Sequence, residues 1–302
     1  MHSLLILLCL ASLNVTVTFS SLYEDINPLL SENDTLFYIA PPGIDPHTYQ
    51  LTPKDVERLK SSDLIISTAH APFELKIKEM VEKGEIKAKL VEIPYIKGIK
   101  LKKNPVLNQT ILHMPIYDPE NYKVFILYIA DILSELNPQC EREYKNNSYC
   151  IIKKLENITS KSQKLNLTGV GDFPFIPYAV SWLNITVSYL VVKEWGVPPS
   201  PNDLLVIEEK MKNGKINIAV VTKSKSAASQ KLEYLANKYG VPVLHVYSPV
   251  VKKSILEKLE YIKNQCKNLK KEVKTSNFEL VFLFLSFLIA LVIRVRKKND
   301  LS

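Results

Sequence analysis

The chain has 302 residues and a formal net charge of +8, with 39 Lys and Arg against 31 Asp and Glu. Much of the positive excess lies between Lys252 and Lys274 and in the C-terminal tail, and the signs of export given below argue against nucleic acid as a partner. With only eight glycines and neither a Gly-X-Ser-X-Gly nor a His-Glu-X-X-His motif, the sequence matches no common hydrolase or phosphate-cradling loop.

The first segment contains an apolar run, from Leu4 to Leu13, that is too short to span a bilayer comfortably. We interpret residues 1–20 as a secretory signal peptide. Lipoprotein-type cleavage at Cys9 has less support, because no Lys or Arg precedes the run and no small residue stands directly before that cysteine.

Residues 21–138 alternate strand and helix signals. The run at 35–40 ends in a Pro-Pro-Gly turn, which predicts a strand, and Thr52 before Pro53 is an N-cap that predicts a helix through Lys60. The later signals are a strand at 63–67, a helix at 72–83 and a strand at 89–93. This alternation predicts an N-terminal α/β lobe with a parallel sheet wrapped by helices.

Residues 166–273 follow the same order and predict a C-terminal α/β lobe. A helix opens at Ser200 and closes at Gly214; a strand at 216–221, a helix at 227–239 and a strand at 241–247 follow. Between the lobes, 118–136 and 144–165 have helical patterns, so we expect residues 139–165 to be a rigid linking helix.

An apolar stripe follows the second lobe, with alternating spacings of four and three, at Ile255, Leu259, Ile262, Cys266, Leu269 and Val273. It is consistent with packing on the second lobe or with a coiled-coil stalk, and the small number of heptads favours packing.

Residues 278–295 are an apolar segment that runs into Arg and Lys, as expected at the cytoplasmic side of a membrane-spanning helix. The predicted fold is therefore α/β: two parallel-sheet lobes, a rigid helical linker, a C-terminal transmembrane helix and a cytoplasmic tail at 296–302. A buried C-terminal core helix is the alternative. The chain would be a single-pass protein of the cell membrane with its binding region outside.

Glycosylation sequons support export. They lie at Asn33, Asn108, Asn146, Asn157, Asn166 and Asn184, with one more at Asn14 inside the signal segment. Cys140 and Cys150 are close enough in sequence to close a short disulfide loop in an oxidising compartment.

Nearly every histidine of the body lies near the end of a predicted strand. His47 follows the first of these strands, His70 follows the second, and His113 precedes a Met-Pro-Ile-Tyr-Asp-Pro segment; His245 lies within the last strand. Ligands of open α/β sheets bind at the carboxyl ends of strands, and neutral imidazole is a common ligand for zinc. The joint placement favours a metal site, although each histidine alone is compatible with an ordinary loop or core residue.

Residues 43–59, GIDPHTYQLTPKDVERL, together with 62–66, closely resemble the metal-binding solute-binding proteins of ABC importers, the TroA- or ZnuA-like family. In that family the histidine of Asp-Pro-His-Thr-Tyr is a metal ligand, so the resemblance assigns this role to His47. It also covers His113 and the Asp118–Tyr122 helix start, which resemble the second ligand and the segment after it. The second lobe resembles the family more loosely.

Two departures concern the second lobe. Where the family has a third histidine, this chain has Gly171–Tyr178, and where it has a carboxylate before a proline, the chain has Ser248-Pro249. Asp172 could replace one ligand, and His70 or His245 another. Alternatively, the second lobe closes over the metal with aromatic side chains and adds no strong ligand, or the solute is no longer a bare ion.

The resemblance implies a binding protein, not an enzyme, that carries Zn²⁺ or Mn²⁺ as its substrate to an ABC permease and its ATPase. The predicted metal ligands are His47, His113, His70 and Asp172. Two other hypotheses remain at this stage: an anchored surface or adhesion protein that has lost part of the metal site, and an anchored metal-dependent hydrolase.

Overall fold

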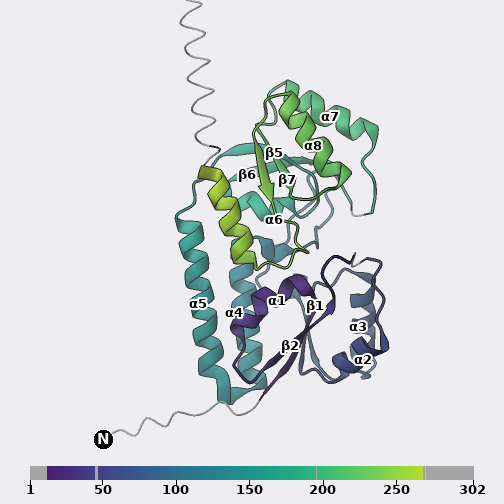
Figure 1. The fold of residues 1–302 in the computed structure, drawn as a ribbon, viewed down its shortest axis with the longest axis vertical. Helices are drawn as coiled ribbons and strands as arrows, with labels where there is room; N and C mark the ends of the chain where they lie inside the picture. The colour runs from purple at the N-terminus through teal and green to yellow at the C-terminus, as the bar shows by residue number, and fades with distance from the viewer. Residues whose placement is uncertain (1–11, 45–46, 195, 268, 270–302) are drawn as a thin grey trace, which may run out of the picture.

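The computed structural model describes residues 12–44, 47–194, 196–267 and 269. These residues form two α/β lobes, each built on a four-stranded parallel sheet, with long helices running alongside (Figure 1). The two-lobed, parallel-sheet part of the predicted fold is thus observed.

The first lobe has the strand order β2-β1-β3-β4. Its strands are β1 (Asn14–Phe19), β2 (Thr35–Ala40), β3 (Leu64–Ser67) and β4 (Lys89–Glu92), and its helices are α1 (Tyr23–Ile26), α2 (Pro53–Lys60) and α3 (Pro72–Glu82). Thr52 caps α2 as the sequence predicts: its hydroxyl accepts from the Asp55 amide, and the Asp55 carboxylate accepts from the Thr52 amide at 2.9 Å.

The predicted signal peptide at 1–20 is wrong for its last seven residues. Residues 14–19 form β1, a central strand whose Val17 pairs with Tyr38 on one side and Ile66 on the other. Every β1 residue after Asn14 is buried, including Thr16 and Thr18. A segment that pairs with two neighbouring strands and fills the core belongs to the folded lobe, since its removal would leave β2 without a strand partner and β3 paired on one side only.

The second lobe has the strand order β6-β5-β7-β8. Its strands are β5 (Leu167–Gly171), β6 (Ile185–Leu190), β7 (Ile218–Thr222) and β8 (Val243–Val246), and its helices are α6 (Ile176–Val180), α7 (Pro201–Lys212) and α8 (Ala227–Lys238). β5 ends in a glycine for a steric reason: a Cβ at Gly171 would lie 2.8 Å from side-chain atoms of Ile176. The chain therefore turns tightly from β5 toward α6.

Two packed helices connect the lobes. α4 (Pro119–Leu136) and α5 (Glu141–Ser160) pack against each other, and α5 runs along one outer edge of the molecule (Figure 1). The Asn147 side chain donates to the carbonyls of Leu29 and Leu30, which fixes α5 against the first lobe. A connector built from packed helices limits the range of hinge motion.

A last helix occupies residues 255–267. Its stripe residues Ile255, Leu259, Ile262 and Cys266 are buried in the main hydrophobic core, which favours the packing interpretation over a coiled-coil stalk. The helix contacts both lobes: the Ile255 amide donates to Asp25 after β1, and Gln265 pairs with the backbone of His245 in β8. We call it the bridging helix.

The predicted transmembrane helix requires correction. Residues 278–295 lie outside the described residues, and among helices of the described ranges none is both long and apolar enough to cross a membrane. Over the described ranges, the fold class is accordingly two α/β lobes joined by helices.

The predicted pairing of Cys140 with Cys150 is also wrong. Cys150 carries an exposed free thiol on α5. α5 is a continuous helix from Glu141, so the interval that was expected to be a short loop is helical instead.

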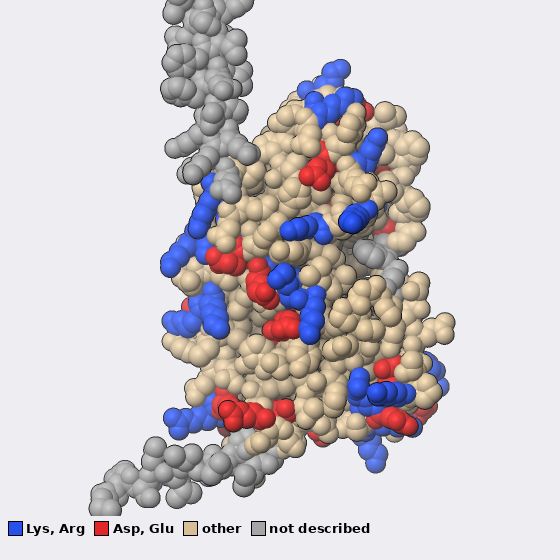
Figure 2. Space-filling model, in the orientation of Figure 1, with Lys and Arg blue, Asp and Glu red and all other residues tan. Residues whose placement is uncertain are grey.

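On the face shown in Figure 2, Lys and Arg side chains are interspersed with Asp and Glu. Ion pairs among the described residues include Lys78–Glu92 and Lys123–Glu156. The charge on this face is therefore mixed in sign and not gathered in one basic area.

Candidate metal centre

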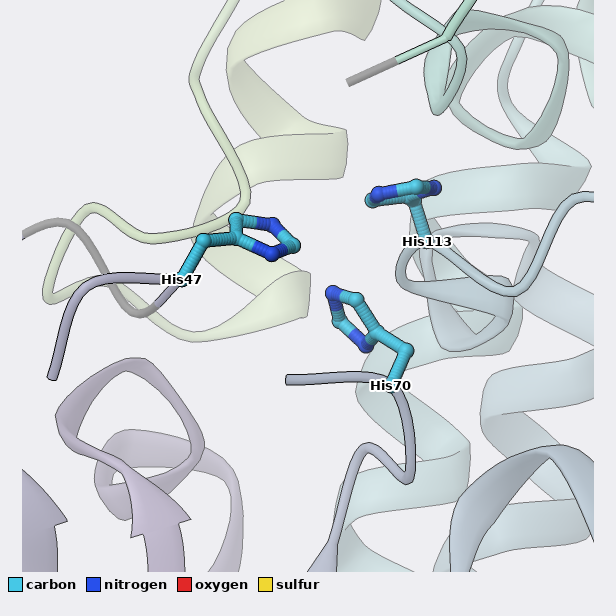
Figure 3. Close-up of side chains that lie close together, drawn as sticks. All are labelled: His47, His70 and His113. Carbon is cyan, nitrogen blue, oxygen red and sulfur yellow. The ribbon is translucent and has the colours of Figure 1, made fainter. Parts of the chain in front are cut away.

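Three histidines from three different loops converge at the carboxyl edge of the first sheet. His47 follows β2, His70 follows β3 and His113 lies in the long segment after β4; their side chains point toward a common space (Figure 3). One nitrogen from each imidazole lies within 4.8 Å of the other two. The ring centroids are 4.7 Å apart for His70 and His113, 5.5 Å for His47 and His70, and 6.1 Å for His47 and His113.

This spacing is close to what a metal ion needs. Nitrogen ligands of a tetrahedral zinc ion lie about 3.3 Å from one another, given zinc–nitrogen bonds of about 2.0–2.1 Å. The three imidazoles therefore need only small side-chain movements to share one ion. His47, His70 and His113, each predicted as a ligand, are brought together by the fold.

The tautomer of His70 follows from its hydrogen bonds. The single hydroxyl proton of Thr68 is donated to Glu74 Oε2 at 2.7 Å, so the hydroxyl oxygen must accept from His70 Nδ1–H at 3.0 Å. A proton on Nδ1 leaves the Nε2 lone pair of His70 available for a metal ion.

Glu74, at the start of α3, is the anchor of this arrangement and was missed by the sequence analysis. It is 2% exposed, and one oxygen accepts from the hydroxyls of Thr18 and Ser67 and from the Thr68 amide. The other oxygen accepts from the Thr68 hydroxyl and from the backbone amides of residues 70 and 71. The whole turn from β3 to α3 is therefore wrapped around one buried carboxylate.

Two residues beside the histidines adopt the left-handed backbone region. Ala69, before His70, has φ 60°, and Met114, after His113, has φ 49°. Residues other than glycine and asparagine rarely adopt this region, because it costs them about 1–2 kcal/mol each. Backbone strain is thus concentrated next to two of the three imidazoles.

Burial favours the neutral form of two of the imidazoles, His70 and His113. Burial, reinforced by the charges that His70 and His47 would carry, lowers the pKa of His113 to about 3. Burial also lowers the pKa of His70, although the Glu74 carboxylate opposes the shift. Neutral imidazole is the form that ligates a metal ion, so the site is prepared for binding at neutral pH.

The second lobe closes this site with apolar groups. A cavity of about 40 Å³ lies against all three histidines, and its other wall is made by Pro174 and Phe175 after β5 and by Ser248, Pro249 and Val250 after β8. A wider cavity of about 260 Å³ adjoins the same histidines and is bordered by polar side chains of Asn104, Gln109, Thr110, Lys193 and Glu194. The small cavity fits an ion, and the wider one gives it an approach.

The fourth predicted ligand, Asp172, is not placed with the histidines. Its carboxylate is fully buried and accepts from the Thr222 amide at 2.6 Å, the Thr222 hydroxyl at 2.7 Å and the Ser229 hydroxyl at 2.7 Å. It therefore joins β5 to β7 and α8 inside the second lobe. His245 also lies away from the cluster, and its Nε2 is 2.9 Å from Glu233 Oε1.

The aromatic cover suggested for the second lobe is partly observed. Phe175 lines the small cavity, and its ring stacks on Tyr117 with centroids 5.9 Å apart. Tyr178 instead donates to the Ile111 carbonyl at 2.7 Å and accepts from the Lys102 amide. It stabilises the segment that leads to His113.

A two-lobed α/β fold with a histidine cluster between the lobes is the arrangement expected of a metal-binding protein, and comparisons with known proteins agree. The family model described as the periplasmic zinc-uptake complex component A, ZnuA, matches residues 15–275. The chain belongs to this family of metal solute-binding proteins. The match begins inside β1, as expected if β1 is part of the folded lobe.

The most similar curated relatives include metal-importer components from streptococci. The metal ABC transporter substrate-binding lipoprotein ScbA of Streptococcus cristatus is 23% identical over 273 residues, with 83% of each chain covered. The manganese-transporter protein ScaA of Streptococcus gordonii is 24% identical with the same coverage, and the iron-transporter protein MtsA of Streptococcus pyogenes serotype M1 is 23% identical with 82% of each chain covered.

Solved structures share the fold at low sequence identity. FpvC of Pseudomonas aeruginosa, solved with Mn²⁺, has a TM-score of 0.69 at 16% identity, with 85% of this chain and 99% of FpvC covered. A crystal structure of ZnuA has a TM-score of 0.66 at 17% identity, with 86% and 98% covered. The predicted family and its binding-protein fold are thereby confirmed.

The predicted single-pass membrane localisation is corrected by these findings. The curated relatives are named as lipoproteins, and the helices described for this chain include no candidate membrane span.

Proposed function

We propose that this chain is the substrate-binding component of a metal-ion ABC importer and that it holds the ion on His47, His70 and His113. The observation that supports this most directly is the convergence of the three imidazoles, with the Nε2 of His70 left unprotonated. A permease and its ATPase are the partners that such a component serves. The carried ion is the substrate, not a resident cofactor.

The donor set favours Zn²⁺ over Mn²⁺. Imidazole nitrogen suits zinc, whereas manganese prefers carboxylate and other oxygen ligands. Among the described residues, the cluster of possible ligands comprises three histidines and no carboxylate. The Glu74 carboxylate stands behind His70 and is occupied by hydrogen bonds.

The first lobe supplies the ligands and the second lobe supplies a cover. Pro174, Phe175, Pro249 and Val250 line the second-lobe side of the cavity with carbon atoms, which limits the contact of water with a bound ion on that side. The small size of the cavity fits a bare ion better than a chelate.

Calorimetry with Zn²⁺ and Mn²⁺ tests the proposal. We expect one tight zinc site, much weaker manganese binding, and a loss of at least about 100-fold in zinc affinity when His47, His70 or His113 is replaced by Ala, since even outer partners of a ligand contribute about 10–100-fold. His245→Ala is the matched control, because that imidazole pairs with Glu233 away from the cluster. A wild-type protein that binds neither ion would favour the surface-protein hypothesis.

A further inference from the structure

One wall of the histidine cavity is a loop of the second lobe, and side chains from outside that lobe bind its backbone. Residues 247–250 follow β8, and three of them, Ser248, Pro249 and Val250, border the histidine cavity. This loop contains no regular structure, so its position depends on what binds its backbone carbonyls.

Lys258 of the bridging helix binds one of these carbonyls. Its side chain is almost fully buried, at 1% exposure, and its ammonium donates to the Pro249 carbonyl at 2.8 Å. The ammonium also lies 6.0 Å from the centre of the Tyr117 ring. A buried ammonium is costly unless its surroundings compensate it, so a lysine at this position is poorly explained by packing alone.

Tyr117 binds a second carbonyl of the same loop. This tyrosine belongs to the short helix just after His113; it is fully buried, and its hydroxyl donates to the Tyr247 carbonyl at 3.0 Å. Its ring stacks on Phe175, the other aromatic wall of the cavity. One residue of the first half of the chain thus contacts both second-lobe walls.

Asp25 fixes the start of the bridging helix. Its carboxylate is 2% exposed and accepts from the Ile255 amide at 2.8 Å and from the Tyr122 hydroxyl at 2.9 Å. Burial raises the pKa of Asp25 to about 6, and the positive charge of Lys258 opposes this shift. The carboxylate and the ammonium therefore stabilise each other's charge across the interface between α1 and the bridging helix.

We propose that Lys258 and Tyr117, with Asp25 as electrostatic partner, form a buried clasp that positions loop 247–250 over the metal cavity and slows release of the ion. Lys258 acts as a positioning residue: it touches the loop, not the histidines. The proposal rests on the metal-binding function above, and it assigns retention to residues outside the ligand set.

Three variants test the clasp. Lys258→Met removes the ammonium but retains a long buried side chain, and Tyr117→Phe removes only the hydroxyl. The double variant Asp25→Asn/Lys258→Met removes both buried charges, so it recovers the stability lost when one charge is left alone. Lys263→Met is the matched control, because Lys263 is a largely buried lysine of the same helix whose ammonium pairs with Glu260.

The readout is the rate at which zinc is transferred to a chromogenic chelator, together with the absorption spectrum of the Co²⁺-loaded protein. We expect Lys258→Met, Tyr117→Phe and the double variant to release zinc at least about 10-fold faster, the effect typical of an outer partner, with a Co²⁺ spectrum that still reports three imidazoles. Lys263→Met should match the wild type. Release at the wild-type rate from the double variant would overturn the clasp.

Hydrogen exchange of the metal-free protein separates this result from failure of the proposed function. Without metal, two amides just after the loop should exchange faster in Lys258→Met than in Lys263→Met: that of Val251, which donates to the Ser248 carbonyl, and that of Lys253, which donates to the Val251 carbonyl. If the wild type binds no zinc, the proposed function fails while this comparison still tests the clasp. Unchanged exchange at both amides would count against the clasp even in a protein that binds zinc.

Discussion

The two lobes use one architecture in different ways. Each places a buried carboxylate at the carboxyl edge of its sheet, Glu74 after β3 and Asp172 after β5, and each carboxylate is surrounded by Ser and Thr hydroxyls and backbone amides. In the first lobe the network continues through Thr68 to His70. In the second lobe it continues from Ser229 to the hydroxyls of Ser224 and Ser226 and reaches no histidine of the cluster.

This difference indicates how a metal site can become one-sided. The same kind of hydrogen-bonded carboxylate orients His70, a proposed ligand, in one lobe and links β5 to β7 and α8 in the other. The second lobe then contributes an apolar wall, made by Pro174, Phe175 and loop 247–250. Retention of the ion depends on how rigidly this wall is positioned. If so, first-lobe changes should alter affinity, and second-lobe changes should alter stability or release rate.

The largest effect is expected from Glu74→Gln. The amide group would place donors where the carboxylate now accepts from backbone amides, so the folded state should lose about 2–3 kcal/mol and zinc affinity about 10–100-fold. Calorimetry and denaturant unfolding measure the two losses. Zinc affinity equal to that of the wild type would show that His70 does not depend on Glu74.

Acid should destabilise the metal-free protein through His113. Its pKa is about 3 in the folded state and about 6.5 in the unfolded state, so between these values the unfolded state binds more protons, and stability falls as the pH falls through this window. At pH 4.5 this single group removes about 2–3 kcal/mol relative to pH 7. Urea unfolding at both pH values should show a smaller difference in His113→Ala than in the control His245→Ala.

Asp172→Asn tests the corresponding carboxylate of the second lobe. Replacing an acceptor oxygen by an amide nitrogen should remove about 1–3 kcal/mol of stability, because the amide and hydroxyl of Thr222 and the hydroxyl of Ser229 all donate to this carboxylate. Zinc affinity should stay within about 2-fold of the wild type, the range of a change with no contact to a ligand. A loss comparable to that of Glu74→Gln would restore Asp172 to the metal site.

Local signals in the sequence predicted much of the fold. The capping residues Thr52 and Ser200 begin α2 and α7 where expected, because each cap is made within three residues of the chain. β1 was missed for the opposite reason: its threonines and valines directly follow an apolar run, and only pairing with β2 and β3 shows that the segment is a central strand.

The candidate site was predictable in part. His47, His70 and His113 were recognised from their places near strand ends and from the family resemblance, and the fold brings them together. Asp172 also lies at a strand end, but Thr222 and Ser229, 50 and 57 residues away, draw its carboxylate into the lobe. Glu74 was within reach, since a Thr at 68 and a Glu at the third position of a helix starting at Pro72 are a local pattern.

The smallest effect is expected from Ala69→Gly. Ala69 has φ 60°, where glycine is free of strain, but glycine also gains freedom in the unfolded chain, so we expect a net stabilisation of about 0.5–1 kcal/mol. Asn184→Gly is the matched second-lobe control: its φ is 59°, but asparagine tolerates this region, so the gain should be smaller. Thermal unfolding of the metal-free and zinc-loaded forms measures both. A stabilised Ala69→Gly protein with weaker zinc binding would mean that a rigid turn at residue 69 is needed to aim His70, since glycine widens the range of orientations that the turn allows.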